Sequence, residues 1–124
     1  MNGMVLVAVD DLLFSSKIRT VAKQAGVELT FARTPTDIIE RARQDRPALV
    51  IFDLDCAKTD PVRTIAALKS DPALAGIRTL GFASHVHTDV IGAARKAGAE
   101  QVLPRSAFAG NLAEILLSAR TSAS

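Results

Sequence analysis

Five apolar runs alternate along the chain with segments in which apolar residues recur at helical spacing. The runs at residues 4–9 and 48–52 are continuously apolar, which is typical of parallel strands that are covered on both faces. Shorter or weaker runs at residues 28–33, 78–84 and 100–104 predict three more strands. The pattern therefore predicts a sheet of five short strands.

The segments between these strands predict five helices, because their apolar residues are spaced by three and four positions. The predicted helices cover residues 14–25, 35 to about 45, 61 to about 71, about 90 to 97, and 112–119. Thr34-Pro35 and Asp60-Pro61 each place a capping side chain before a proline, and this combination begins helices. We therefore interpret Asp60 as a capping residue.

Strict alternation of strands and helices favours a parallel sheet, because each parallel connection needs a right-handed crossover. The expected fold is α/β, a flavodoxin-like doubly wound sheet of order 2-1-3-4-5 with helices on both faces, in three layers. The length of 124 residues fits a single domain over residues 1–124, with a polar tail from about residue 120.

Composition and charge narrow the classes of function. The chain is 48% hydrophobic and 23% charged, which favours a folded core, and its 15 basic and 13 acidic residues are interspersed, so we expect no direct nucleic-acid partner. The apolar runs are shorter than the ~20 residues of a membrane helix, so we expect a cytoplasmic protein with no membrane partner. The single cysteine, Cys56, excludes an intramolecular disulfide, and we interpret it as a small apolar filler.

Acidic residues follow two of the strands that this order makes neighbours. Asp10 and Asp11 follow the first strand, and Asp53 and Asp55 follow the third. Ligands of such folds bind outside the carboxyl ends of the strands, where the strand order reverses, so we expect the four carboxylates to converge there. Carboxylates at short range repel unless a cation lies among them, and oxygen ligands suit Mg²⁺ and phosphoryl chemistry.

These residues carry a resemblance to a known family. With the segments "VAVDD", "LVIFDLD" and "AGAEQVLPRS", the chain resembles the receiver domains of two-component response regulators over almost its whole length. The resemblance implies a stand-alone signalling domain rather than an enzyme. It implies that Asp53 accepts a phosphoryl group from a histidine kinase or phosphotransfer protein. It also implies Mg²⁺ bound by Asp10, Asp11, Asp53 and the backbone carbonyl of Asp55.

Several positions depart from the pattern of that family. The Ser/Thr position at the end of the fourth strand falls on Ala83, with Ser84 one place later. The lysine position falls on Arg105, followed by Ser106 instead of proline, and the position of the switch aromatic falls on Val102. Arginine keeps the positive charge but has a different geometry from lysine. Two hypotheses follow: a divergent receiver that is phosphorylated on Asp53, or a pseudo-receiver that binds proteins independently of phosphorylation.

The family also implies a downstream protein partner and a possible homodimer. Receivers often pair through the fourth helix, the fifth strand and the last helix. Arg95, Lys96 and Arg105 are expected near that face, where solvation alone explains them.

A second resemblance concerns only the stretch "VIFDLDCAKTD", which is similar to the first motif of haloacid dehalogenase-type phosphatases. There the first Asp attacks phosphorus and the second is an acid/base. Three features disfavour this reading: the stretch belongs to the third strand, "CA" replaces Gly-Thr, and the chain is short. His85 and His87 are interpreted as solvated loop residues, and we assign no metal to them.

Overall fold

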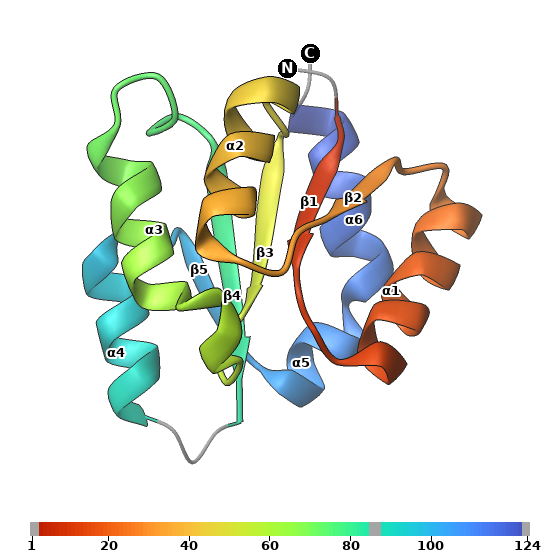
Figure 1. Ribbon diagram of the computed structural model, residues 1–124. Helices are drawn as coiled ribbons and strands as arrows, with labels where there is room; N and C mark the ends of the chain where they lie inside the picture. The colour runs from red at the N-terminus through yellow and green to blue at the C-terminus, as the bar shows by residue number, and fades with distance from the viewer. Residues whose placement is uncertain (1–2, 85–87, 123–124) are drawn as a thin grey trace.

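A computed structural model describes residues 3–84 and 88–122 of the chain (Figure 1). Its sheet has five parallel strands in the order β2-β1-β3-β4-β5, which confirms the predicted topology. The strands are β1 Val5–Ala8, β2 Leu29–Phe31, β3 Leu49–Asp53, β4 Arg78–Ala83 and β5 Gln101–Pro104.

Helices cover both faces of this sheet and complete three layers. They are α1 Leu12–Ala25, α2 Pro35–Asp45, α3 Pro61–Ser70, α4 Thr88–Ala97, α5 Arg105–Gly110 and α6 Leu112–Ser122, with a short 3₁₀ helix η1 Ala57–Thr59. One buried cluster joins the sheet to α1, α5 and α6, and another joins it to α2, α3 and α4. No helix in the described ranges is long and apolar enough to cross a membrane.

The continuous burial of β1 and β3 explains their apolar sequences. Every residue of both strands is buried, since helices pack on each side of the sheet. Alternate side chains enter opposite clusters, with Val7 on the side of α1 and Leu6 on the side of α2. A fully buried aliphatic side chain contributes about 1.5–3 kcal/mol, so these central strands carry much of the stability of the fold.

Two predictions about the helices are wrong. The described residues contain six α-helices rather than five, because α5 spans only six residues with Phe108 as its one buried side chain, too short to show a periodic pattern. Asp60 does precede α3, but it has a left-handed backbone (φ 44°) and its side chain caps nothing. A capping residue needs an extended backbone. Thr34 has one (φ −128°) and accepts a hydrogen bond from the backbone N–H of Asp37, at 3.2 Å.

Candidate functional site

Asp53 is the last residue of β3 and is buried at the carboxyl edge of the sheet. Its Oδ1 accepts hydrogen bonds from the backbone N–H of Asp55, at 2.9 Å, and from Nη2 of Arg105, at 3.3 Å. Arg105 begins α5, directly after β5. The position that counting assigned to the family lysine therefore does place a cation on Asp53.

The loop after β3 is fixed by its contact with β4. The side chain of Leu54 lies against Gly81, where an added Cβ would be 2.8 Å from Leu54 Cδ1. The backbone N–H of Leu54 also donates to the carbonyl of Phe82, at 2.9 Å. A residue without a side chain at position 81 thus allows the loop to approach closely and brings Asp55 to the end of β4.

Asp55 contacts the same arginine as Asp53. Its Oδ2 accepts the backbone N–H of Ser84, at 3.0 Å, and Nη2 of Arg105, at 3.4 Å. One guanidinium nitrogen therefore lies between two carboxylates. Ser84 takes part through its main chain, and Ala83 is the buried last residue of β4.

Aromatic rings hold the arginine in place. The guanidinium carbon of Arg105 lies 5.2 Å from the ring centroids of both Phe14 and Phe82, within the range of cation–π attraction. The rings of Phe82 and Phe108 are stacked at 4.3 Å, and Phe14 meets both edge-on. Sequence analysis missed Phe14 and Phe82 as positioning residues, because apolar periodicity assigns them only to the core.

Burial raises the pKa of Asp53 above its ordinary value. The N–H of Asp55 and the guanidinium of Arg105 lower the pKa, but they do not cancel the effect of burial, and the nearby charge of Asp55 raises it further. Asp53 is therefore a buried carboxylate whose negative charge is incompletely compensated.

Asp10 and Asp11 are engaged elsewhere. Oδ1 of Asp10 lies 3.4 Å from Nε of Arg33 and 3.9 Å from Nζ of Lys58. Asp11 is exposed and caps α1, where its Oδ1 accepts the backbone N–H of Phe14, at 3.1 Å. Local cations and a helix terminus thus bind this pair, and the expected convergence of the four carboxylates on one ion stays a prediction.

These side chains do not fit a divalent ion as they are placed. Among the described residues, no three His, Cys, Asp or Glu side chains are grouped so that they could hold a metal. Mg²⁺ prefers near-octahedral oxygen ligation, and in this arrangement Oδ1 of Asp10 is paired with two cations instead. The Mg²⁺ site therefore stays a prediction. His85 and His87 lie outside the described residues.

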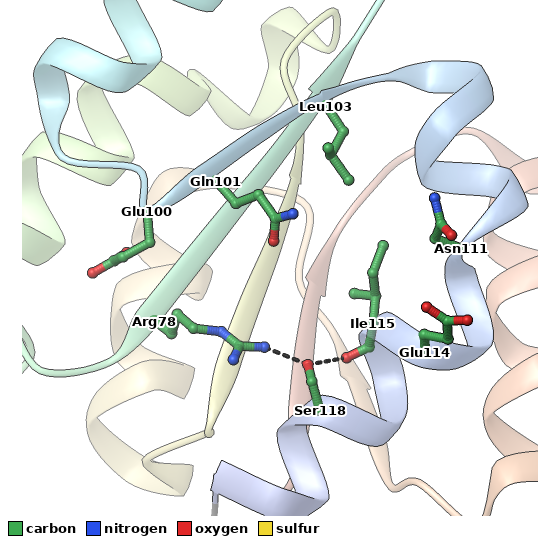
Figure 2. A pocket seen from close by; sticks show the side chains of 8 residues that line it. All are labelled: Arg78, Glu100, Gln101, Leu103, Asn111, Glu114, Ile115 and Ser118. Atoms are coloured by element: carbon green, nitrogen blue, oxygen red, sulfur yellow. Dashed lines mark hydrogen bonds between the residues drawn. The ribbon is translucent and has the colours of Figure 1, made fainter.

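Two surface hollows are lined mainly by residues from β4 to α6. One, of about 550 Å³, adjoins the candidate site and is lined by Phe14, Ser84, Pro104, Arg105, Ser106 and Ala109. The other, of about 620 Å³, lies between β5 and α6 and contains none of the predicted site residues (Figure 2). In the second hollow, Nη2 of Arg78 donates to the hydroxyl of Ser118, at 2.6 Å.

Comparison with known proteins identifies the fold. No family model and no curated protein matches the chain. Among solved structures, it is similar to the phosphorylated cyanobacterial phytochrome response regulator RcpA, with a TM-score of 0.79 and 20% identity over 95% of this chain and 91% of that one. A response regulator from Hahella chejuensis gives 0.83 and 21%, over 95% of both chains.

A third similar structure is a signal receiver domain from Bermanella marisrubri, with a TM-score of 0.83 and 20% identity over 97% of this chain and 99% of that one. These neighbours extend over nearly the full length of both chains. The chain therefore has the fold of response regulator receiver domains.

Proposed function

We propose that this chain is a phosphorelay signalling domain that accepts a phosphoryl group on Asp53. One observation carries the proposal: a buried carboxylate at the carboxyl end of β3 accepts hydrogen bonds from Arg105 and from the backbone N–H of Asp55, and the neighbouring Asp55 carboxylate holds the N–H of Ser84 beside it. Cations and N–H donors close to the carboxylate can bind the negatively charged oxygens of a phosphoryl group attached to it. The receiver fold supports the same function.

The transfer is a substitution at phosphorus. A carboxylate oxygen of Asp53 attacks the phosphorus of a phosphohistidine on a histidine kinase or phosphotransfer protein. A P–O bond forms as the P–N bond breaks, and the released histidine nitrogen takes a proton from water. The phosphoryl group brings about −1.5 to −2 charges, and the Arg105 guanidinium compensates for one of them.

The signal then passes through a protein surface to a downstream partner. The added charge has to shift a two-state element, and the candidates are the groups bound to Asp53 and Asp55, which are Arg105 at the start of α5 and the N–H of Ser84 directly after β4. Val102 is buried in β5 and has no aromatic ring, so the transmission does not use a rotating aromatic at that position. Pairing of two copies through α4, β5 and α6 stays a prediction.

When bound, Mg²⁺ would neutralise negative charge during the transfer, and Asp10, Asp11, Asp53 and the carbonyl of Asp55 are the residues proposed to hold it. A titration tests this prediction separately. Binding to the folded protein raises the melting temperature with ligand concentration, whereas no change up to millimolar Mg²⁺ excludes the site. Asp10→Asn is the matched variant, and its melting temperature should respond less.

The phosphoacceptor itself is tested by incubation with acetyl phosphate and Mg²⁺, followed by intact-mass measurement. The wild type should gain the mass of one phosphoryl group, and Asp53→Asn should gain none. Asp60→Asn carries the same charge change at the other end of the connection between β3 and α3, and it should be modified like the wild type. Modification of Asp53→Asn would contradict the proposal. Release of phosphate over many turnovers from a small phosphomonoester would favour a phosphatase instead.

A second candidate function is a pseudo-receiver that binds proteins independently of phosphorylation. The observation that favours it is the pairing of Asp10 with two cations of the protein itself, Arg33 and Lys58. For a pseudo-receiver, none of the three proteins in the mass experiment would be modified.

A further inference from the structure

The carboxylate of Asp55 occupies hydrogen-bond donors beside Asp53. Its Oδ2 accepts the backbone N–H of Ser84, which directly follows β4, and Nη2 of Arg105, which begins α5. These two donors come from separate elements and meet at one oxygen. The side chain of Asp55 is 18% exposed, so it lies mostly within the site rather than in solvent.

The same arginine nitrogen also contacts Asp53. Nη2 lies 3.3 Å from Oδ1 of Asp53 and 3.4 Å from Oδ2 of Asp55. Both distances are longer than the 2.7–2.9 Å of a strong charge-assisted hydrogen bond. Arg105 is thus shared between two carboxylates, and its distance to each is longer than that of a strong hydrogen bond.

A phosphoryl group on Asp53 would meet the Asp55 carboxylate. Its oxygens would extend from a side chain whose own Oδ1 already accepts from Arg105 and from the N–H of Asp55. Beside it, the Asp55 carboxylate accepts the N–H of Ser84 and the same nitrogen of Arg105. Two anions within reach of one guanidinium repel each other, and Ser84 has a single N–H. The two anions therefore compete for the same donors.

We propose that Asp55 is the resident anion of this site. Its carboxylate binds the Ser84 N–H and Arg105 while Asp53 is unmodified, and it has to leave both donors when Asp53 is phosphorylated. Asp55 thereby slows phosphorylation and links the state of Asp53 to the end of β4. This inference rests on the proposed function, since it concerns the same carboxylate and the same chemistry.

A substitution can test the side chain of Asp55 without removing the contacts of its main chain. Asp55→Asn removes the charge but keeps the backbone N–H that donates to Asp53 and the backbone carbonyl predicted to bind Mg²⁺. Asp60→Asn is the matched control, because Asp60 Oδ2 lies 3.8 Å from the exposed Arg63. Asparagine also tolerates the left-handed backbone at position 60.

The first experiment compares the rate of modification by acetyl phosphate, followed by intact mass. Asp55 has to release both donors before the transfer, so the rate falls by the same factor as this release equilibrium, about tenfold for a charge-assisted hydrogen bond. Asp55→Asn should therefore be modified roughly tenfold faster than the wild type. Asp55→Ala should change in the same direction, and Asp60→Asn should match the wild type. Equal rates for the wild type and Asp55→Asn would overturn the inference and leave the proposed function standing.

The second experiment observes the contact without phosphorylation. At neutral pH, the amide ¹H and ¹⁵N shifts of Ser84 should differ between Asp53→Asn and Asp53→Asn/Asp55→Asn, because the double variant loses the carboxylate that accepts this N–H. Asp53→Asn/Asp60→Asn is the control, and its Ser84 shifts should match those of Asp53→Asn. Unchanged Ser84 shifts in Asp53→Asn/Asp55→Asn would show that Asp55 does not hold the amide and would overturn the inference. If neither the wild type nor Asp55→Asn is modified in the first experiment, the proposed function fails, and the competition fails with it.

Discussion

Two clusters of carboxylates and cations lie at opposite ends of the strands: Glu100 with Lys69 at the amino ends, and Asp53 and Asp55 with Arg105 at the carboxyl ends. They differ in the length and the sharing of their contacts. At the amino edge, Glu100 Oε1 accepts the backbone N–H and the hydroxyl of Thr79, each at 2.8 Å, and Oε2 lies 2.6 Å from Nζ of Lys69. At the carboxyl edge, Asp53 and Asp55 share one nitrogen of Arg105 at 3.3 and 3.4 Å. The contacts of Glu100 are short and are not shared with a second carboxylate, whereas those of Asp53 and Asp55 with Arg105 are longer and are shared between the two.

The pKa values follow this difference. Burial raises the pKa of Glu100, but the hydrogen bonds from Lys69 and Thr79 lower it more, and the net shift is downward. For Asp53, burial prevails and the pKa is raised. The contrast indicates that Glu100 stabilises the fold, whereas the charge on Asp53 is maintained at a cost in stability. Such incomplete compensation is typical of functional sites.

The largest expected effect is at the amino edge. Glu100→Ala leaves the backbone N–H of Thr79, a fully buried residue, without its carboxylate partner, and should destabilise the fold by about 2–3 kcal/mol. Urea unfolding at neutral pH measures this as a lower midpoint with an unchanged slope. The exposed Glu40 provides the control, since Glu40→Ala should change stability by no more than about 0.5 kcal/mol.

The pH dependence sharpens the comparison. Because the pKa of Glu100 is lowered in the folded state, its stabilising contribution is fully present above the ordinary value of 4.5 and is lost as the pH falls through the folded pKa. The stability difference between the wild type and Glu100→Gln should therefore shrink below pH 4.5. A difference that stays constant down to the acid transition would show that the charge of Glu100 does not matter.

At the carboxyl edge, we expect the opposite pH dependence of stability. Because the pKa of Asp53 is raised, the folded state binds the proton more tightly, and stability falls as the pH rises from 3.8 through the folded pKa. Asp53→Asn removes this loss and should raise stability at neutral pH, by an amount on the order of 1 kcal/mol. Thermal unfolding at pH 7 and at low pH measures it, and a destabilised Asp53→Asn at pH 7 would remove the distinction between the two edges.

The smallest effect is expected at an ordinary surface pair. Asp37 Oδ1 lies 3.5 Å from Nε of Arg41 on α2, with both side chains more than 40% exposed. Asp37→Ala should cost only about 0.3–0.5 kcal/mol for the lost pair. The loss should shrink in 1 M salt, which screens exposed charges. A loss as large as that of Glu100→Ala would show that contact length and burial do not separate the clusters.

The fold was largely predictable because its signal is local. Continuous apolar runs identify β1 and β3, and alternation with helices leads to the order 2-1-3-4-5. What was missed depends on features that do not repeat in the sequence. The helix α5 has a single buried residue, Phe108, so it shows no apolar periodicity. The left-handed backbone at Asp60 cannot be recognised from the sequence, because an Asp before a proline is also what a capping residue looks like.

The site was predictable only in part. Counting along the family pattern placed Arg105 opposite Asp53, and the structure shows their contact. The partners of Asp10 were not predictable, because Arg33, after β2, and Lys58, in η1, reach it with long side chains from separate parts of the chain. Which cation pairs with a given carboxylate depends on three-dimensional packing. The positions of the strand ends in the sequence predict only which carboxylates could belong to the site.

The central claim is that Asp53 itself forms the acyl phosphate, and the most direct measurement identifies the modified residue. Treatment with acetyl phosphate and Mg²⁺ followed by borohydride reduction converts a phosphorylated aspartate to homoserine, which peptide mass spectrometry locates in the chain. The account predicts homoserine at position 53 in the wild type and none in Asp53→Asn. Homoserine at position 10, 11 or 55, or at no position, would contradict it.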